Sequence, residues 1–144
     1  MLNWGLMTLR EAAWAPLSVF ITYSVAKAFG VYLAYPSLDI PTHFMGGVAI
    51  AYFYQSAVAN SQKFIGSIPA PIKNILALTC TGTTTVLWEF SEFISDTFFH
   101  TNMILGLEDT LKDMLMGLLG GLALLLLHRT GRSSVFDASS GGDH

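Results

Sequence analysis

The sequence predicts an all-α fold: a polytopic bundle of four transmembrane helices with both termini in the cytoplasm. Of its 144 residues, 52% are hydrophobic and only 12% are Asp, Glu, Lys or Arg, whereas a soluble domain carries roughly 25% charged residues. A chain of this length is one domain, and a small soluble domain has the most surface to cover with polar groups. Four apolar stretches also approach the roughly 20 residues that a bilayer-crossing helix needs. Together these observations exclude a soluble monomer and predict an integral membrane protein.

The four predicted spans follow one another with short breaks. They cover about residues 12–35, 41–59, 72–98 and 110–127. Pro41 suits the first turn of the second span, where its missing N–H costs nothing. Prolines also occur in the first two breaks, and the third break runs from His100 to Asp109. Residues 1–132 are therefore expected to form one transmembrane domain, and the small, polar residues 133–144 a disordered cytoplasmic tail.

Lysines and arginines in the connections predict the orientation of the spans, because they favour the cytoplasmic side. They occur before the first span, between the second and third, and after the fourth, at Arg10, Lys63, Lys73, Arg129 and Arg132. The other two connections contain neither residue. We therefore expect both termini and the middle connection to be cytoplasmic, and the other two connections to face outward.

Most of the remaining charge falls in the outer half of this topology. Seven carboxylates and two lysines give a formal charge of −5 when the histidines are neutral. They are Lys27, Asp39, Glu89, Glu92, Asp96, Glu108, Asp109, Lys112 and Asp113. A charge at the centre of a lipid-facing helix costs about 2.5–3.5 kcal/mol even on the most lenient scale. These side chains are therefore expected to face one another across the bundle.

The spacing of these residues places them on helix faces. Glu89, Glu92 and Asp96 are spaced i, i+3, i+7 and follow one stripe, and Gly117 and Gly121 continue the line of Asp109 and Asp113. Small residues would let the helices approach closely. They are Gly46 and Gly47 in the second span, Thr81 to Thr85 in the third, and Gly117 and Gly121 in the fourth.

A partly dry site with this much negative charge needs neutralising. Protons, a divalent cation or a cationic ligand such as an amine head group could each do so. The candidate metal ligands are Asp39, His43, Glu89, Glu92, Asp96, Asp109 and Asp113. These oxygen and nitrogen donors suit Mg²⁺, Mn²⁺, Zn²⁺ or Fe²⁺. Lys27 and Lys112 are the accompanying cations.

Ordinary structural roles compete for several of these residues. Asp39 and Asp109 each stand where a helix N-cap is expected. Lys112 could extend its ammonium group to the outer surface, and Lys27 could pair with a carboxylate. Glu89, Glu92 and Asp96 are harder to explain in this way, because no cap or connection needs them inside a span.

The order of these residues resembles the YjdF-like family, a domain of unknown function. The resemblance rests on Asp39-x-x-x-His43, on Trp88-Glu89-x-x-Glu92 followed by Asp96, and on Asp109-Thr110-x-x-Asp113-Met114 with Gly120-Gly121. It covers the last three spans, and the chain is more loosely similar to VanZ-like proteins. The resemblance implies a polytopic α-helical membrane protein of a bacterial or archaeal cell membrane. It implies no particular activity.

Two functions remain open at this point, and the sequence does not decide whether the protein is an enzyme. One is a metal-dependent membrane enzyme that acts on a lipid or lipid-linked substrate, with an unligated carboxylate as general base on a metal-bound water. The other is a non-catalytic binding or transport module for a cation, protons or an amine head group. A purely structural ion-paired bundle ranks lower, because two lysines cannot balance seven acids.

The expected partners are the lipid bilayer and a lipid or small-molecule ligand. The glycine-containing spans also allow a helix-mediated oligomer. Nucleic-acid binding is excluded by seven Lys and Arg residues and a net charge of −3. The single cysteine, Cys80, excludes a disulfide framework or a cysteine-based zinc site.

Overall fold

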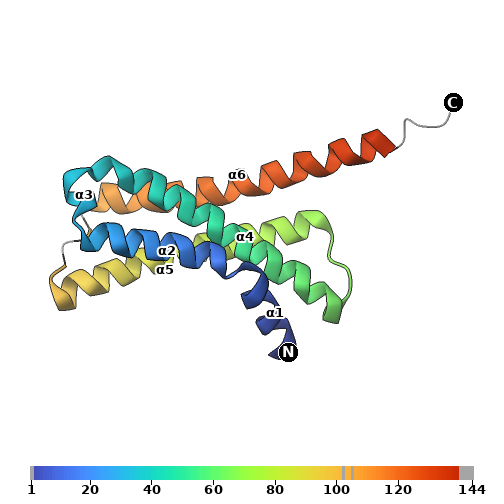
Figure 1. The fold of residues 1–144 in the computed structure, drawn as a ribbon, viewed down its shortest axis with the longest axis horizontal. Helices are drawn as coiled ribbons and strands as arrows, with labels where there is room; N and C mark the ends of the chain where they lie inside the picture. Colours follow the sequence, from blue (N-terminus) through green and yellow to red (C-terminus); the bar gives the residue numbers. More distant parts are fainter. Residues whose placement is uncertain (1, 102, 105, 140–144) are drawn as a thin grey trace.

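The structure, a computed structural model, describes residues 2–101, 103–104 and 106–139, with side chains from residue 3 to residue 128. Its elements are α1 (Leu2–Ala12), α2 (Trp14–Ala28), α3 (Val31–Ala34), η1 (Pro36–Leu38), α4 (Asp39–Ile65), α5 (Ala70–Phe99) and α6 (Leu107–Ser139). Every element in this part of the chain is helical, which confirms the predicted all-α class. Figure 1 shows α2, α4, α5 and α6 running roughly along one direction, with α1 turned away from them.

Pro16 explains the bend between α1 and α2. Its ring would collide with the carbonyl of Ala12, and it has no N–H to donate to that carbonyl. The neighbouring hydrogen bonds continue on either side, from Ala13 N to Leu9 O and from Leu17 N to Ala13 O. The helix therefore bends at this point, and α1 packs beside the second half of α4, where the Trp4 indole donates to the Ala57 carbonyl.

The first predicted span, residues 12–35, is not one continuous helix. The helix α2 ends at Ala28, just before Gly30. The φ of Gly30 is 68°, a left-handed conformation that glycine adopts most readily. The amide of Gly30 donates to the Lys27 carbonyl, which closes the end of α2. At about 1.5 Å per residue, the 15 residues of α2 span roughly 22 Å. The short helix α3 then carries the chain to η1 and α4.

The other three predicted spans lie inside longer helices. α4, α5 and α6 have 27, 30 and 33 residues, so each extends beyond the predicted stretch at both ends. α6 also runs to Ser139, into the segment 133–144 that was predicted to be a tail. Residues 140–144 lie outside the described part of the chain, and the disordered tail stays a prediction.

The interior of the bundle is built from small and polar side chains. Among the described residues, the buried hydrophobic ones are six alanines and Leu125, while Thr81, Thr85, Glu89, Glu92 and Asp113 are also buried. Large apolar side chains point outward instead, as with Leu87 at 61% exposure and Phe93 at 57%. A water-soluble protein rarely exposes so many large apolar side chains. Small interior residues and an apolar exterior are typical of helices that pack in a membrane.

One described segment, Leu107–His128 of α6, is long and apolar enough by length and composition to cross a bilayer. This supports a membrane location for α6. It leaves the number of spans as a prediction.

Three helices meet along a seam of residues spaced four apart. In order, α4 contributes His43, Gly47 and Ala51, α5 contributes Glu89, Thr85 and Thr81, and α6 contributes Asp113, Gly117 and Gly121. Because α5 runs opposite to α4 and α6, these residues form three layers, each with one member from each helix. Close contacts within the layers join Gly47 to Gly117, Gly117 to Thr85, and Gly121 to Thr81 and Ala51. The layer His43, Glu89 and Asp113 is the polar end of this seam.

Glycine is required where α4 crosses α6. A Cβ on Gly47 would overlap the carbonyl of Gly117, and a Cβ on Gly120 would overlap the carbonyl of Phe44. By contrast, a Cβ on Gly46, the residue next to Gly47, meets nothing within 4 Å. The two adjacent glycines therefore have different roles, and of these two Gly47 is the one that lies at the close contact between the helices.

We expect Gly47→Ala to lower the free energy of unfolding by about 1–3 kcal/mol, the usual cost of overpacking a close contact. Gly46→Ala is the matched control, and alanine should stabilise that helix position by up to about 1 kcal/mol. Thermal unfolding of the two variants in the same detergent measures the difference. Equal melting temperatures for both variants would contradict the described crossing.

Candidate metal centre

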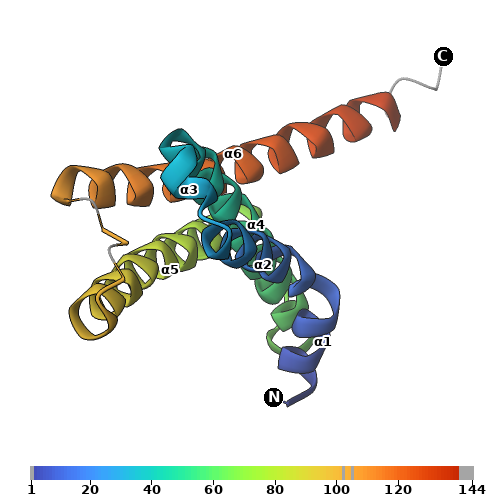
Figure 2. The ribbon, with the colours of Figure 1, turned by 60° about the vertical axis from the view of Figure 1, so that its left-hand side comes forward.

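The polar end of the seam lies where α2 ends and α4 begins. Figure 1 shows the end of α5 and the start of α6 at this same end of the molecule, beside α3. Turning the molecule, as in Figure 2, shows α6 crossing α4 at an angle while α5 diverges below it. The start of α4 packs against α6 near Asp113 and Gly117, and each helix begins with acidic residues, Asp39 in α4 and Glu108 and Asp109 in α6. Carboxylates favour this position because helix N-termini carry partial positive charge.

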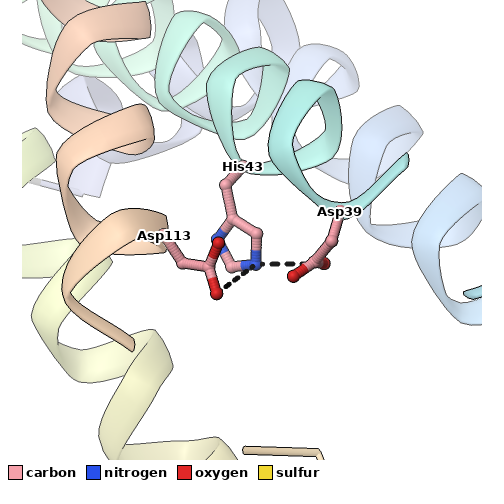
Figure 3. A group of neighbouring side chains, drawn as sticks. All are labelled: Asp39, His43 and Asp113. Atoms are coloured by element: carbon pink, nitrogen blue, oxygen red, sulfur yellow. Dashed lines mark ion pairs between the residues drawn. The ribbon is translucent and has the colours of Figure 1, made fainter. Parts of the chain in front are cut away.

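Asp39, His43 and Asp113 form a compact cluster at this crossing. One ligand atom from each lies within 4.8 Å of the others. The Nε2 atom of His43 is 3.4 Å from Asp39 Oδ1 and 4.0 Å from Asp113 Oδ2. Figure 3 shows both carboxylates reaching the same ring nitrogen, with the imidazole between them. Two acids thus converge on one nitrogen from two different helices.

Glu89 lies on the other side of the imidazole. Its Oε1 atom is 3.9 Å from Nδ1 of His43. A histidine that binds a metal through one nitrogen usually directs the other toward a carboxylate or carbonyl, which fixes the ring. At 3.9 Å this separation is longer than a hydrogen bond, so Glu89 would have to move closer to orient the ring from behind, while Asp39 and Asp113 lie in front of it.

The carboxylate of Asp113 is the most deeply buried part of the cluster. Its side chain is 4% exposed, and its Oδ1 atom is buried without a hydrogen-bond partner among the described residues. Leaving a buried acceptor unsatisfied costs about 1–3 kcal/mol, and more when it is charged. Buried polar atoms are nearly always partnered, so this one calls for an explanation such as a bound ion.

The spacing of the donor atoms fits a small divalent cation. A tetrahedral ion with ligands at about 2.1 Å holds neighbouring donors about 3.4 Å apart. The Asp39–His43 separation has this value, and the Asp113 contact at 4.0 Å needs only a small contraction. One imidazole and two carboxylates form a mixed donor set that suits Zn²⁺, Fe²⁺ or Mn²⁺. The residues present therefore fit such an ion.

Glu92, one of the predicted ligands, is held by other partners. Its Oε1 atom accepts hydrogen bonds from the Tyr23 hydroxyl at 2.9 Å and from the Trp88 indole at 3.1 Å. Lys27 in turn donates to the Tyr23 oxygen at 3.3 Å. The Tyr23 bond ties α5 to α2 and directs the Glu92 carboxylate toward α2.

Asp96 and Asp109 also have partners of their own. Asp96 accepts hydrogen bonds from the Thr101 hydroxyl and from the amides of Met103 and Ile104, so it holds the connection that follows α5. Asp109 pairs with Lys112 at 2.8 Å, one turn apart on the surface of α6. Both carboxylates therefore serve the local structure at the mouth of the site.

Of the seven predicted ligands, the structure thus gathers Asp39, His43 and Asp113, with Glu89 behind them. Tyr23 and Trp88 were not predicted as functional residues, although each lies four residues from a charged one on the same helix, Lys27 and Glu92 respectively. This four-residue spacing could have indicated from the sequence that Tyr23 contacts Lys27 and that Trp88 contacts Glu92.

A cavity with charged side chains in its walls adjoins the cluster at Asp39. It has a volume of about 550 Å³, and its walls include Asp39 and Glu92 together with Lys27, Asp109 and Lys112. Tyr23 and Tyr32 also line it. Charged side chains from four helices thus surround one space beside the candidate ligands.

Comparisons with known proteins agree with this description. The family model described as Predicted membrane protein (DUF2238) matches residues 7–133, which confirms the YjdF-like resemblance. The looser similarity to VanZ-like proteins is not supported. No curated protein and no solved structure matches the chain. Because the family model covers most of its length, the chain belongs to the DUF2238 family of predicted membrane proteins.

Proposed function

We propose that α2, α4, α5 and α6 cross the membrane of a prokaryotic cell as four spans, with both termini in the cytoplasm. Three observations support this: the outward-facing large apolar side chains, the positions of the lysines and arginines, and the arrangement of the helices. α1 and the α4–α5 connection lie away from the end that carries α3 (Figure 1). In this topology the cluster lies in the outer half of the bilayer.

Reporter fusions test the topology. We expect a cytoplasmic fluorescent reporter inserted between α4 and α5, at Gly66, to be active, and an exported phosphatase inserted there to be inactive. The opposite pattern is expected at Gly106, before α6. Both glycines have positive φ values, 90° and 131°, and lie outside the helices they follow or precede. The same reporter activity at both sites would rule out the proposed arrangement.

The proposed function of the site is to bind one divalent cation through Asp39, His43 and Asp113. The buried carboxylate of Asp113 carries this proposal: its Oδ2 atom lies 4.0 Å from His43 Nε2, its Oδ1 atom has no hydrogen-bond partner among the described residues, and a cation held by this carboxylate would offset its buried charge. The cation would also offset the negative charge that Asp39, Glu89 and Asp113 place around a single imidazole. A buried charge of this kind otherwise requires protonation or another counter-ion.

We further propose that the site acts on a lipid or lipid-linked substrate from the outer half of the membrane. A substrate head group in the cavity beside Asp39 would lie next to one of the cation's proposed ligands. A divalent ion there would polarise a substrate oxygen or a bound water. Glu89 would keep the His43 ring oriented. Glu92 would hold α2 beside the cavity through Tyr23.

Metal analysis of the purified chain tests the cation site. The wild-type protein is expected to retain about one equivalent of Zn²⁺ or Mn²⁺ per chain after dialysis. Asp113→Asn and His43→Gln should each lose nearly all of it, because each removes a ligand. Glu89→Gln should weaken metal affinity by about 10- to 100-fold, the usual effect of losing an orienting partner.

Asp96→Asn and Glu108→Gln are the matched controls, because each neutralises a carboxylate at the same end of the molecule outside the cluster. They should retain the metal. Melting temperatures measured on the same samples show whether each variant is folded. Less than about a tenth of an equivalent in the wild type, or equal losses in Asp113→Asn and Asp96→Asn, would refute the site.

A further inference from the structure

The N-terminal helix α1 lies far from the candidate metal centre and crosses the second half of α4. Figures 1 and 2 both show α1 turned away from α2, beside this part of α4. The Trp4 indole donates to the Ala57 carbonyl, and the Asn60 amide donates to the Glu11 carboxylate, both at 2.7 Å. The two α1 residues are seven apart, whereas their partners are three apart on α4. The helices therefore cross at an angle instead of running side by side.

One face of α1 packs on the bundle and a second, apolar face is exposed. Thr8 and Ala12 are 2% and 0% exposed. Their spacing of four residues puts them on one face, and α4 is the helix against which α1 mainly packs. Leu6 and Leu9, by contrast, are 52% and 54% exposed. They are three residues apart and share another face.

The exposed apolar face points toward the middle of α4. Leu9 lines an apolar cavity of about 450 Å³ together with Ile50 and Phe53 of α4. Leu9 and Glu11 are two residues apart, which puts them on opposite sides of α1. Glu11 accordingly reaches Asn60, closer to the end of α4. The apolar side of α1 therefore faces the centre of the bundle, and the acidic side faces the end of α4.

Polar residues complete the circumference of α1. Asn3 and Arg10 are both exposed and lie seven residues apart, so they share a face that adjoins Glu11. This polar face lies away from the Thr8–Ala12 contact with α4. A separation of exposed residues into an apolar side and a polar side is typical of helices that lie in the plane of a membrane surface.

The position of α1 along α4 matches the boundary of the bilayer. α4 has 27 residues, with Tyr52 at its middle. Ala57 and Asn60 lie five and eight residues beyond Tyr52, which is roughly 8 and 12 Å along the helix. Half of the hydrocarbon core is about 15 Å thick. With α4 centred in the bilayer, α1 lies a few ångströms inside the boundary between acyl chains and head groups, the depth of an interfacial helix.

We propose that α1 is an interfacial helix that binds the cytoplasmic leaflet, with Leu6 and Leu9 among the acyl chains and Arg10 at the phosphate groups. The inference rests on the proposed topology, which puts this end of α4 in the cytoplasmic leaflet, and it does not involve the cation. It gives α1 an anchoring function. Trp4 contributes an indole at a depth where tryptophan is common, and the Glu11–Asn60 hydrogen bond holds the anchor on α4.

Spin-label depth measurements on the full chain test the proposal in vesicles of phosphatidylethanolamine and phosphatidylglycerol. Single cysteines replace Leu6, Leu9, Asn3 or Arg10, which are all exposed, in a Cys80→Ser background. Collision with oxygen, which concentrates among acyl chains, is compared with collision with a water-soluble nickel chelate. Labels at Leu6 and Leu9 are expected about 5–10 Å inside the boundary. Labels at Asn3 and Arg10 are expected at the boundary or outside it, where the nickel chelate reaches them.

Two further labels calibrate the depth scale. Leu87→Cys marks the bilayer interior, because Leu87 is 61% exposed near the middle of α5. Ser67→Cys marks the water, because Ser67 is exposed in the connection between α4 and α5. Nickel access at Leu6 and Leu9 equal to that at Ser67 would place α1 in water and overturn the proposal. Exclusion of both oxygen and nickel from Leu6 and Leu9 would also overturn it, because a protein surface, such as a second copy of the chain, would then cover this face.

Tryptophan fluorescence gives a second measurement that needs no label. The double variant Trp14→Phe and Trp88→Phe leaves Trp4 as the remaining tryptophan. Lipids brominated in the upper half of the acyl chain should quench Trp4 more strongly than lipids brominated near the chain end. Absence of quenching by either lipid would overturn the interfacial position.

The reporter fusions at Gly66 and Gly106 separate this inference from the topology on which it rests. If the reporters behave as expected, labels at Leu6 and Leu9 that lie in water overturn the assignment of α1 alone. A reversed reporter pattern overturns the topology, and with it the assignment of α1 to the cytoplasmic leaflet.

Discussion

The close contact between Gly47 and Gly117 is the constraint on which the site depends. Each glycine lies one helical turn from a member of the cluster, Gly47 from His43 and Gly117 from Asp113. Because side chains four residues apart share a face, bringing the two glycines together also places His43 opposite Asp113. Larger residues at the crossing would separate α4 from α6, and with them the nitrogen and oxygen atoms that converge on one point.

The membrane setting explains why such a site can persist. Apolar side chains face outward and small ones face inward, so the helices associate through close packing rather than through burial of large apolar groups. Carboxylates inside the bundle are then shielded from lipid but remain costly without a counter-charge. Lys27 and Lys112 are too few to supply it, and both already interact at the mouth of the site, with Tyr23 and Asp109. A divalent cation meets the requirement at the place where Asp113 lacks a partner.

The helical class and the family could be predicted from composition and residue order, and periodicity placed Asp113, Gly117 and Gly121 on one line that the structure confirms as a packing seam. The partners of individual carboxylates could not be predicted in this way, because they depend on contacts between distant segments. Glu89 and Glu92 share a stripe in the sequence. Because they are three residues apart, however, their side chains do not point in the same direction, and Glu92 faces Tyr23 on α2. Asp96 binds amides of the connection that follows α5, and no periodicity predicts the path of a connection. The bend at Pro16 and the end of α2 at Gly30 also follow from local chemistry that a count of apolar residues overlooks.

The most direct test of the central claim is the X-ray absorption spectrum of the zinc-loaded protein. If the α4–α6 crossing assembles the site, the zinc edge should show only nitrogen and oxygen ligands at about 2.0–2.2 Å, with the outer-shell scattering of a single imidazole. His43→Gln, which should retain almost no zinc, should give almost no zinc edge under the same loading. A zinc ion with sulfur ligands, with several imidazoles, or with the wild-type spectrum in His43→Gln would contradict the account.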